Sequence, residues 1–153
     1  MQTIRIFVAG LALGGVVVGA LGSVAAQPAR RTINLPGRTT QAPFSDAILA
    51  GDTLYLSGRL GMDPQTGQPP SEPRQEARNV LDQIRLVLEE AGMTMDDLVS
   101  VHVFCSDVTF YADFNAVYSS YFTSDPPARA FLGAGPLLRG ARFEVMGIAV
   151  KRS

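Results

Sequence analysis

Apolar and polar positions along the chain predict two amphipathic helices. Residues 73–91 place apolar side chains three and four positions apart, which forms one stripe along a helix face. Glu72 and Pro73 suit the start of this helix, and Gly92 suits the residue just beyond its end. Residues 111–122 repeat the pattern with aromatic side chains on one face. Both segments therefore need another layer of structure to cover their apolar faces.

The remaining apolar segments are strand-like. They alternate or are rich in β-branched residues, and turn residues separate them. Gly51-Asp52, for example, predicts a tight turn between two short strands. We expect strands at residues 46–50, 53–58, 99–106, 128–132 and 142–151, with a further short strand at 32–34. The main order, β-β-α-β-α-β-β, predicts an α+β domain with one mixed β-sheet and both helices on one face.

The last expected strand is apolar on both faces. Phe143 and Val145 alternate with Met146 and Ile148, so neither side of the strand is polar throughout. Two helices can cover one face of the sheet, and residues 27–153 contain no further helical pattern for the other face. We therefore expect a second subunit to cover that face, which predicts an oligomer.

A targeting segment is expected at the N-terminus. Arg5 precedes an uncharged, largely apolar run of 21 residues that ends in the small side chains of Ala25 and Ala26. This arrangement predicts a secretory signal peptide, residues 1–26, cleaved after Ala26. The run is also long enough for an uncleaved membrane anchor, the one contact with a membrane that we expect. In either case we expect an exported protein, periplasmic or secreted, with a single domain over residues 27–153.

Composition removes several kinds of chemistry. The chain has 13 basic and 14 acidic residues and no basic run longer than a pair such as Arg30-Arg31, so no cationic face for nucleic acid is expected. One histidine, His102, and one cysteine, Cys105, are too few for the usual zinc site. The only lysine, Lys151, lies near the C-terminus, a poor position for a buried Schiff base. We therefore expect no metal and no bound cofactor.

Arg129 and Glu144 are the candidate functional pair. An arginine can bind a carboxylate through two parallel N–H···O bonds, and a glutamate can orient a water molecule or accept its proton. The two residues are fifteen positions apart, in the expected strands 128–132 and 142–151. The element order places them on adjacent late strands of the sheet. Their spacing alone is also compatible with an ordinary surface ion pair.

Four segments of the chain resemble the RidA (YjgF/YER057c/UK114) family. They occur in the family's order across about residues 31–151 and read APFSDAILAGDTLYLSGRLGMDPQTG, LEEAGMTMDDLVSVHVFCSD, DFNAVYSSYF and PPARAFLGAGPLLRGARFEVMGIAV. The resemblance implies a chorismate-mutase-like α+β fold, assembled as a homotrimer with sites in the clefts between subunits. It also implies hydrolysis of 2-imino and 2-enamino acids, such as 2-iminopropanoate and 2-aminoacrylate, to 2-oxo acids and ammonia without a cofactor.

Position by position, the resemblance implies roles for five residues. Arg129 binds the substrate carboxylate, and Glu144 positions the attacking water. Ser57 and Gly58 line the cleft, and Asn115 helps to shape it. Holding an electrophilic iminium beside an oriented water supplies much of the rate, so no strong nucleophile is needed. The alternatives are a non-catalytic trimer that binds a small carboxylate, and a holdase-like or ribonuclease-like role.

Two residues depart from the family pattern. Phe44 stands where most active members have a tyrosine, which removes a hydroxyl group from the expected pocket. Phe131 stands where many members have a cysteine or another small residue, so a phenyl ring changes the shape of the pocket. We expect both side chains to be substrate-binding residues. The resemblance therefore supports the binding of a carboxylate by Arg129 more directly than it identifies the acid that carries this carboxylate.

Overall fold

The computed structural model describes residues 29–38 and 42–152. The expected signal segment, residues 1–26, lies outside this part of the chain. None of the helices in the described part is both long enough and apolar enough to span a membrane.

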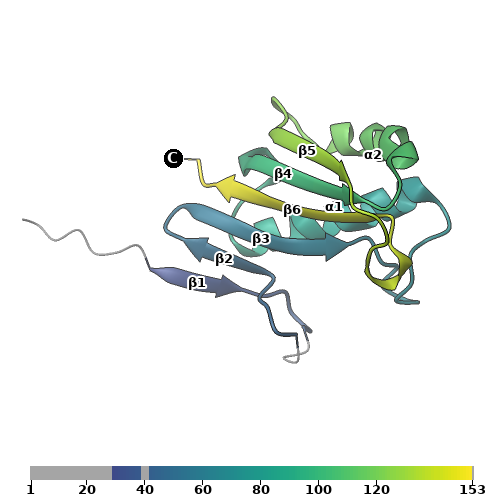
Figure 1. The fold of residues 1–153 in the computed structure, drawn as a ribbon. Coiled ribbons are helices and arrows are strands. Elements are labelled where there is room, and N and C mark those ends of the chain that lie inside the picture. The colour runs from purple at the N-terminus through teal and green to yellow at the C-terminus, as the bar shows by residue number, and fades with distance from the viewer. Residues whose placement is uncertain (1–28, 39–41, 153) are drawn as a thin grey trace, which may run out of the picture.

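Six strands form one mixed sheet (Figure 1). They are β1 (Arg30–Ile33), β2 (Ala47–Ala50), β3 (Thr53–Leu60), β4 (Leu98–Cys105), β5 (Ala128–Gly133) and β6 (Phe143–Val150). Their order across the sheet is β1-β2-β3-β6-β4-β5, and only the β4–β5 pair is parallel. A parallel pair requires a crossover connection, and the helix α2 (Tyr111–Tyr118) supplies it.

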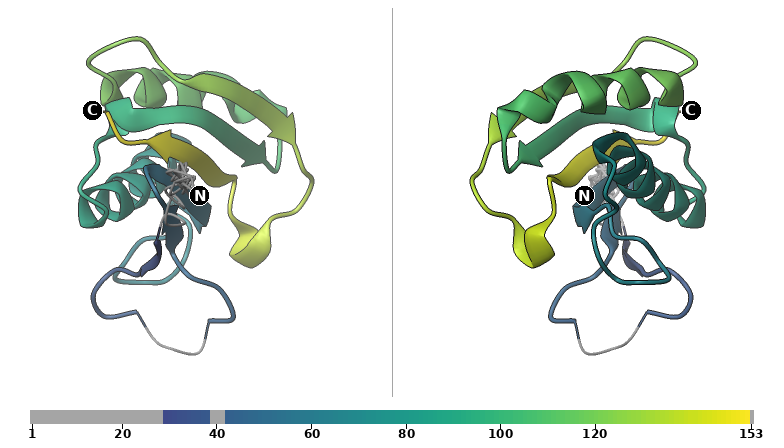
Figure 2. Two further views of the ribbon diagram at one scale, coloured as in Figure 1. Left: turned by 90° about the vertical axis from the view of Figure 1, so that its left-hand side faces the viewer. Right: turned by 90° about the vertical axis from the view of Figure 1, so that its right-hand side faces the viewer.

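Both helices, α1 (Pro73–Glu90) and α2, lie on the same side of the sheet (Figure 2). α1 has Pro73 in its first turn, where a missing N–H is tolerated. Gly92 follows the end of α1 with a φ of +74°, a left-handed conformation that suits glycine. The buried apolar residues of α1 are Ala77, Val80, Leu81, Ile84, Val87 and Leu88. The expected α+β architecture is confirmed.

Most expected elements agree closely with the observed ones. The second helix is the largest difference, because α2 ends at Tyr118 and the chain continues as a 3-10 turn over Ser119–Tyr121. β3 runs on to Leu60 because an irregularity between Leu56 and Arg59 lets the strand resume its pairing with β6.

The expectation that Arg129 and Glu144 occupy adjacent strands is wrong. β4 lies between β5, which carries Arg129, and β6, which carries Glu144. β4 precedes both strands in the sequence and pairs with both of them. β5 and β6 are therefore consecutive along the chain but are not neighbours in the sheet. β5 is consequently an edge strand, and Arg129 lies at the margin of the sheet.

The face of the sheet away from the helices, here called the open face, is not covered within the described chain. Tyr55, Met146 and Val150 lie on it and are 51%, 37% and 38% exposed. On the other face, Phe143 and Val145 are buried in the core beneath the helices. The sheet thus buries one apolar face and exposes another, an arrangement that favours contact with a further protein surface.

Candidate functional site

Arg129 lies among aromatic rings on the edge strand β5. Its guanidinium carbon is 4.5 Å from the ring centre of Tyr118, and 5.8 to 6.0 Å from the ring centres of Tyr111, Phe114 and Phe131. Three of these rings belong to α2, and the fourth belongs to β5. Ring faces attract a cation without neutralising its charge. The rings therefore hold the guanidinium while its positive charge stays available to a ligand.

A cavity of about 370 Å³, here called the Arg129 cavity, adjoins this guanidinium. Its lining residues are Asn115, Tyr118, Ser119, Pro126, Pro127 and Arg129. Within residues 29–38 and 42–152, Arg129 forms no salt bridge. The structure thus brings Asn115 and Arg129 to one cavity, where an arginine without a carboxylate partner suits an anionic ligand.

Tyr118 is a site residue that the sequence pattern did not indicate, because its place on the apolar face of a helix predicted only a core residue. Its side chain is 6% exposed, and its hydroxyl has no hydrogen-bond partner in the described part of the chain. Burial raises the pKa of Tyr118 to about 12, although the charge of Arg129 acts in the opposite direction. The phenol is therefore neutral at physiological pH. Its three-residue spacing from Asn115 is the signal that could have indicated it.

Glu144 lines a separate cavity of about 250 Å³, here called the Glu144 cavity. The other residues that line it are Phe44, Ser57, Gly58, Leu60 and Leu138. The structure therefore brings Phe44, Ser57 and Gly58 to Glu144, the grouping that the resemblance implies. Leu60 and Leu138 join them without a signal in the sequence, because one comes from the end of β3 and the other from the turn before β6.

Gly58 permits the close approach of Glu144. A β-carbon at position 58 would lie 2.1 Å from Glu144 Oε1, which is too short for any stable contact. Ser57 Oγ donates a hydrogen bond to the Ser45 carbonyl at 2.6 Å, so its hydrogen is already used within the protein. Among the described residues that line this cavity, the Glu144 carboxylate is the only charged group.

The buried side chain of Glu76 fixes the start of β6, close to Glu144. Its carboxylate accepts the backbone N–H groups of Arg142 at 2.6 Å and Phe143 at 3.1 Å. It also forms a salt bridge of 2.7 Å with Arg142 Nη1. Because these bonds hold the two residues before Glu144, they tie the position of its backbone to α1.

Arg129 and Glu144 do not meet within one chain. Arg129 pairs in register with Val101, whose side chain is buried beneath the helices. Glu144 pairs with Phe104, three positions further along β4 and therefore on the open face. The two side chains project from opposite faces of the sheet, and they line two separate cavities.

The side chain of Phe131 packs against α2. Its ring makes edge-to-face contacts with Tyr111, at 5.0 Å between ring centres, and with Phe114, at 5.7 Å. In the single chain it lines neither the Arg129 cavity nor the Glu144 cavity. Its phenyl group instead completes the aromatic surrounding of Arg129.

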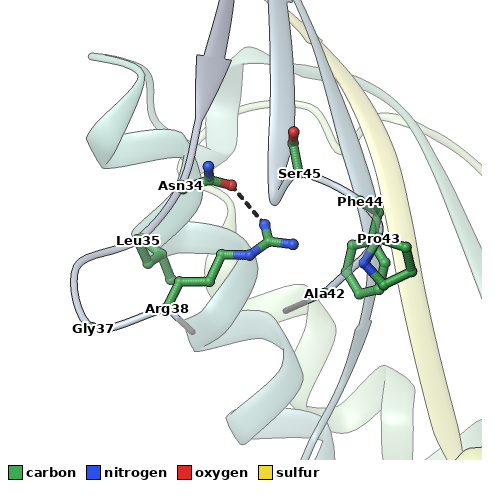
Figure 3. Close-up of a pocket in the computed structure, with 8 residues that line it drawn as sticks. All are labelled: Asn34, Leu35, Gly37, Arg38, Ala42, Pro43, Phe44 and Ser45. Carbon is green, nitrogen blue, oxygen red and sulfur yellow. Dashed lines mark hydrogen bonds between the residues drawn. The ribbon is translucent and has the colours of Figure 1, made fainter. Parts of the chain in front are cut away.

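A third cavity, of about 550 Å³, shares Phe44 with the Glu144 cavity (Figure 3). Arg38 reaches across it, and its Nη1 donates to Asn34 Oδ1 at 2.6 Å and to Asp46 Oδ1 at 2.5 Å. The Arg38 guanidinium also lies 5.1 Å from the ring centre of Phe44. These contacts anchor the loop that carries Phe44.

Residue types that bind metals are dispersed. No group of three or more His, Cys, Asp or Glu side chains in the described residues is placed to hold a metal ion. Cys105 is buried, its thiol donates to the Asp107 carbonyl at 2.9 Å, and burial raises the pKa of that thiol. His102 lies on β4 opposite Met146, away from both cavities described above.

The chain is similar to known proteins along most of its length. The family model described as Endoribonuclease L-PSP matches residues 36–151. A protein of Bos taurus named 2-iminobutanoate/2-iminopropanoate deaminase is 39% identical over 110 residues, which cover 71% of this chain and 80% of that protein. A protein of Sulfurisphaera tokodaii named RutC family protein is 36% identical over 110 residues, which cover 71% of this chain and 88% of that protein.

Solved structures have the same fold. The crystal structure of the YjgF gene product from E. coli gives a TM-score of 0.74 at 29% identity, and the match covers 80% of this chain and 99% of that one. The structure of E. coli TdcF with bound serine gives a TM-score of 0.73 at 26% identity with the same coverage, 80% and 99%. Since sequence and fold agree over most of its length, the chain belongs to the RidA/YjgF family, whose family model carries the description Endoribonuclease L-PSP.

Proposed function

We propose that this protein hydrolyses 2-imino and 2-enamino acids, such as 2-iminopropanoate and its tautomer 2-aminoacrylate, to 2-oxo acids and ammonia. The observation that carries the proposal is the setting of Arg129, a guanidinium held by aromatic rings beside a cavity and without a salt bridge in the described residues. Such a group suits a substrate with a carboxylate. The name of the Bos taurus relative, a 2-iminobutanoate/2-iminopropanoate deaminase, supports this substrate class.

The proposed site needs two copies of the chain. Arg129 and Glu144 project from opposite faces of the sheet, so one chain cannot present both groups to one small molecule. The open face exposes apolar side chains, and Arg129 lies on an edge strand. We propose a homotrimer in which the Arg129 cavity of one subunit meets the Glu144 cavity of the next. A head-to-tail contact of this kind, repeated around a threefold axis, closes a ring and forms three equivalent sites.

In each site the two charged groups have separate tasks. Arg129 binds the substrate carboxylate through two N–H···O bonds and so fixes the position of the iminium carbon. Glu144 holds a water molecule, whose oxygen forms a bond to that carbon while its proton passes to the Glu144 carboxylate. Glu144 then returns the proton to the nitrogen. As the C–N bond breaks and ammonia leaves, the proton of the new hydroxyl group passes to Glu144 and from there to the departing ammonia, which becomes ammonium. The carbon retains the water oxygen as the carbonyl of the 2-oxo acid.

A non-catalytic carboxylate-binding protein is the second candidate function. The Arg129 cavity is complete within one chain and can bind a carboxylate without Glu144. In that case a 2-oxo acid binds, but no imine is hydrolysed. The two candidate functions therefore share one class of ligand, and they differ in whether hydrolysis follows binding.

RNA cleavage, which the name of the family model suggests, is not favoured as a function. The chain has 13 basic and 14 acidic residues, so its net charge gives no general attraction for a polyanion. The described histidine, His102, lies away from both site cavities. We propose a small carboxylate as the ligand and no nucleic-acid partner.

Ammonia release from 2-aminoacrylate generated in situ tests the proposed function. The purified protein should accelerate this release, and Arg129→Ala should lower kcat/KM about 100-fold because the carboxylate loses a bidentate partner. Arg31→Ala, which changes an exposed arginine on β1, is the matched control and should keep the full rate. If the wild-type protein gives no acceleration but binds pyruvate in calorimetry, the proposed hydrolytic function is refuted and the non-catalytic binding function is supported.

A further inference from the structure

Two arginines share one buried carboxylate near the start of β2. Arg38 Nη1 lies 2.5 Å from Asp46 Oδ1, and Arg59 Nη2 lies 3.0 Å from Asp46 Oδ2. The Asp46 side chain is 4% exposed, and those of Arg38 and Arg59 are 15% and 16% exposed. Within residues 29–38 and 42–152, neither arginine forms a salt bridge with any other carboxylate. Because buried charges are normally paired, this cluster lacks one negative charge.

The same two arginines have buried donor nitrogens that no acceptor uses. In the described part of the chain, Arg38 Nη2, Arg59 Nε and Arg59 Nη2 are buried and have no hydrogen-bond partner. The contact of Arg59 Nη2 with Asp46 is close but lacks hydrogen-bond geometry. The Asp46 carboxylate already accepts from Arg38 Nη1 and from the backbone N–H of Leu35. Buried donors without an acceptor are rare in folded proteins, and a bound ion or water is a common reason for them.

Arg38 lines the cavity of about 550 Å³ drawn in Figure 3, here called the Arg38 cavity. The other described residues that line it are Asn34, Leu35, Gly37, Ala42, Pro43, Phe44 and Ser45. Arg38 is the only charged residue among them, so no carboxylate of this lining repels an anion. Its guanidinium lies between Asn34 and Phe44 (Figure 3). Arg59 is not part of the lining and contributes through its charge alone.

Asn34 offers a second donor to the same cavity. Its Oδ1 accepts hydrogen bonds from Arg38 Nη1 at 2.6 Å and from the backbone N–H of Asp46 at 3.0 Å. These two bonds use the oxygen of the amide, so the Nδ2 group keeps its hydrogens for a ligand. Hydrogen bonds from such donors to an ionised oxygen are stronger than those between neutral groups. The cavity therefore combines an excess positive charge with two kinds of unused donor.

We propose that the Arg38 cavity binds a small oxyanion, such as phosphate or a free carboxylate, through the Arg38 guanidinium and the Asn34 amide. The anion supplies the negative charge that the two arginines and Asp46 lack. This site shares no described lining residue with the Arg129 cavity, and it does not depend on the proposed hydrolysis. Phe44 lines both the Arg38 cavity and the Glu144 cavity, so the bound anion lies beside a wall of the proposed active site.

Calorimetry with phosphate at constant ionic strength tests this site. Arg129→Ala serves as the background, so that phosphate cannot use the other arginine cavity, and it should bind one phosphate per chain. Adding Asn34→Asp keeps the oxygen that accepts from Arg38 and Asp46 but replaces the amide donor by a negative charge. This change should weaken phosphate binding at least about tenfold. Gln65→Glu, which adds the same charge at an exposed position outside the cavity, is the matched control and should keep the affinity.

Arg38→Lys is a second variant, because a lysine keeps the positive charge beside Asp46 but has no group equivalent to Nη2. It should also weaken phosphate binding about tenfold. Acetate in the same background distinguishes a carboxylate from phosphate as the tighter ligand. If neither anion binds saturably to Arg129→Ala, or if Asn34→Asp and Gln65→Glu bind equally well, the inference is overturned. Either result leaves the proposed hydrolysis intact, and a failure of hydrolysis leaves the anion site intact.

Discussion

Arg129 and Glu144 project from opposite faces of one sheet, because Arg129 is in register with Val101 and Glu144 is in register with Phe104 on the same strand, β4. The odd offset along β4 places the two partners, and hence the two charges, on different faces. For this reason, a single site that contains both Arg129 and Glu144, as we propose, needs two copies of the chain.

Complementation between two inactive variants tests that arrangement. Arg129→Ala and Glu144→Gln should each lose most activity when assayed alone. When equal amounts of the two variants are refolded together, each subunit at a cleft carries the required wild-type residue with a probability of about one half. About one quarter of the clefts therefore contain both Arg129 from one subunit and Glu144 from the next. The mixture should therefore recover about one quarter of the wild-type rate. A mixture that is no more active than its components would show that both residues act from the same chain.

Replacement of Gly58 by alanine should abolish the proposed hydrolysis without unfolding the protein. The new β-carbon would occupy space 2.1 Å from Glu144 Oε1, so the carboxylate must move. A displacement of about 1 Å can cost about 100-fold in rate when it misplaces a reacting group. Gly133→Ala, whose β-carbon meets only Val108 Cγ1 at 3.2 Å, is the control and should keep its activity. Full activity of a folded Gly58→Ala protein would exclude Glu144 from the reaction.

Removal of the charge on Glu76 should destabilise the fold. Glu76→Gln leaves Arg142 without its buried carboxylate partner and weakens the bonds to the start of β6. Breaking a buried ion pair by changing one partner typically lowers the free energy of unfolding by about 3–5 kcal/mol. Urea denaturation should show this decrease, whereas Glu90→Gln, at an exposed position of α1, should remain within about 0.5 kcal/mol of wild type. Equal midpoints for the two variants would contradict the prediction.

Tyr118 should make stability depend on pH in the alkaline range. Burial raises its pKa from 10.0 to about 12 in the folded protein, so the folded state retains a proton that the unfolded state loses. The stabilisation is complete below about pH 10 and is lost as the pH rises toward 12, with a total of about 2–3 kcal/mol. In Tyr118→Phe the free energy of unfolding should fall less steeply over this range. Parallel curves for the variant and the wild type would rule out this role of Tyr118.

Export of the protein should leave an N-terminus at Gln27. The small residues before this position suit a signal peptidase, so cleavage after Ala26 is expected. Intact-mass measurement of the exported protein should give the mass of residues 27–153, and Ala26→Arg should block the cleavage. A full-length mass for the wild-type protein in the membrane fraction would favour the uncleaved anchor instead.

Most elements of the fold could be predicted because their signals are local. The stripe of α1 repeats every three to four residues, and Gly92 marks its end, so neither depends on the rest of the chain. The alternation along β6 likewise separates the buried Phe143 and Val145 from the exposed Met146. The grouping of Phe44 and Ser57 with Glu144 followed from the family resemblance, since no periodic pattern links these residues.

What the sequence by itself determined was therefore the set of helices and strands, the α+β class and the candidate charges Arg129 and Glu144. Only the tertiary structure decided that β4 lies between their strands, that the two side chains occupy opposite faces, and that Tyr118 and Leu138 belong to the cavities. Strand order and register depend on hydrogen bonds between segments far apart in the chain. Such pairings leave no regular pattern among nearby residues, so only the assembled sheet shows them.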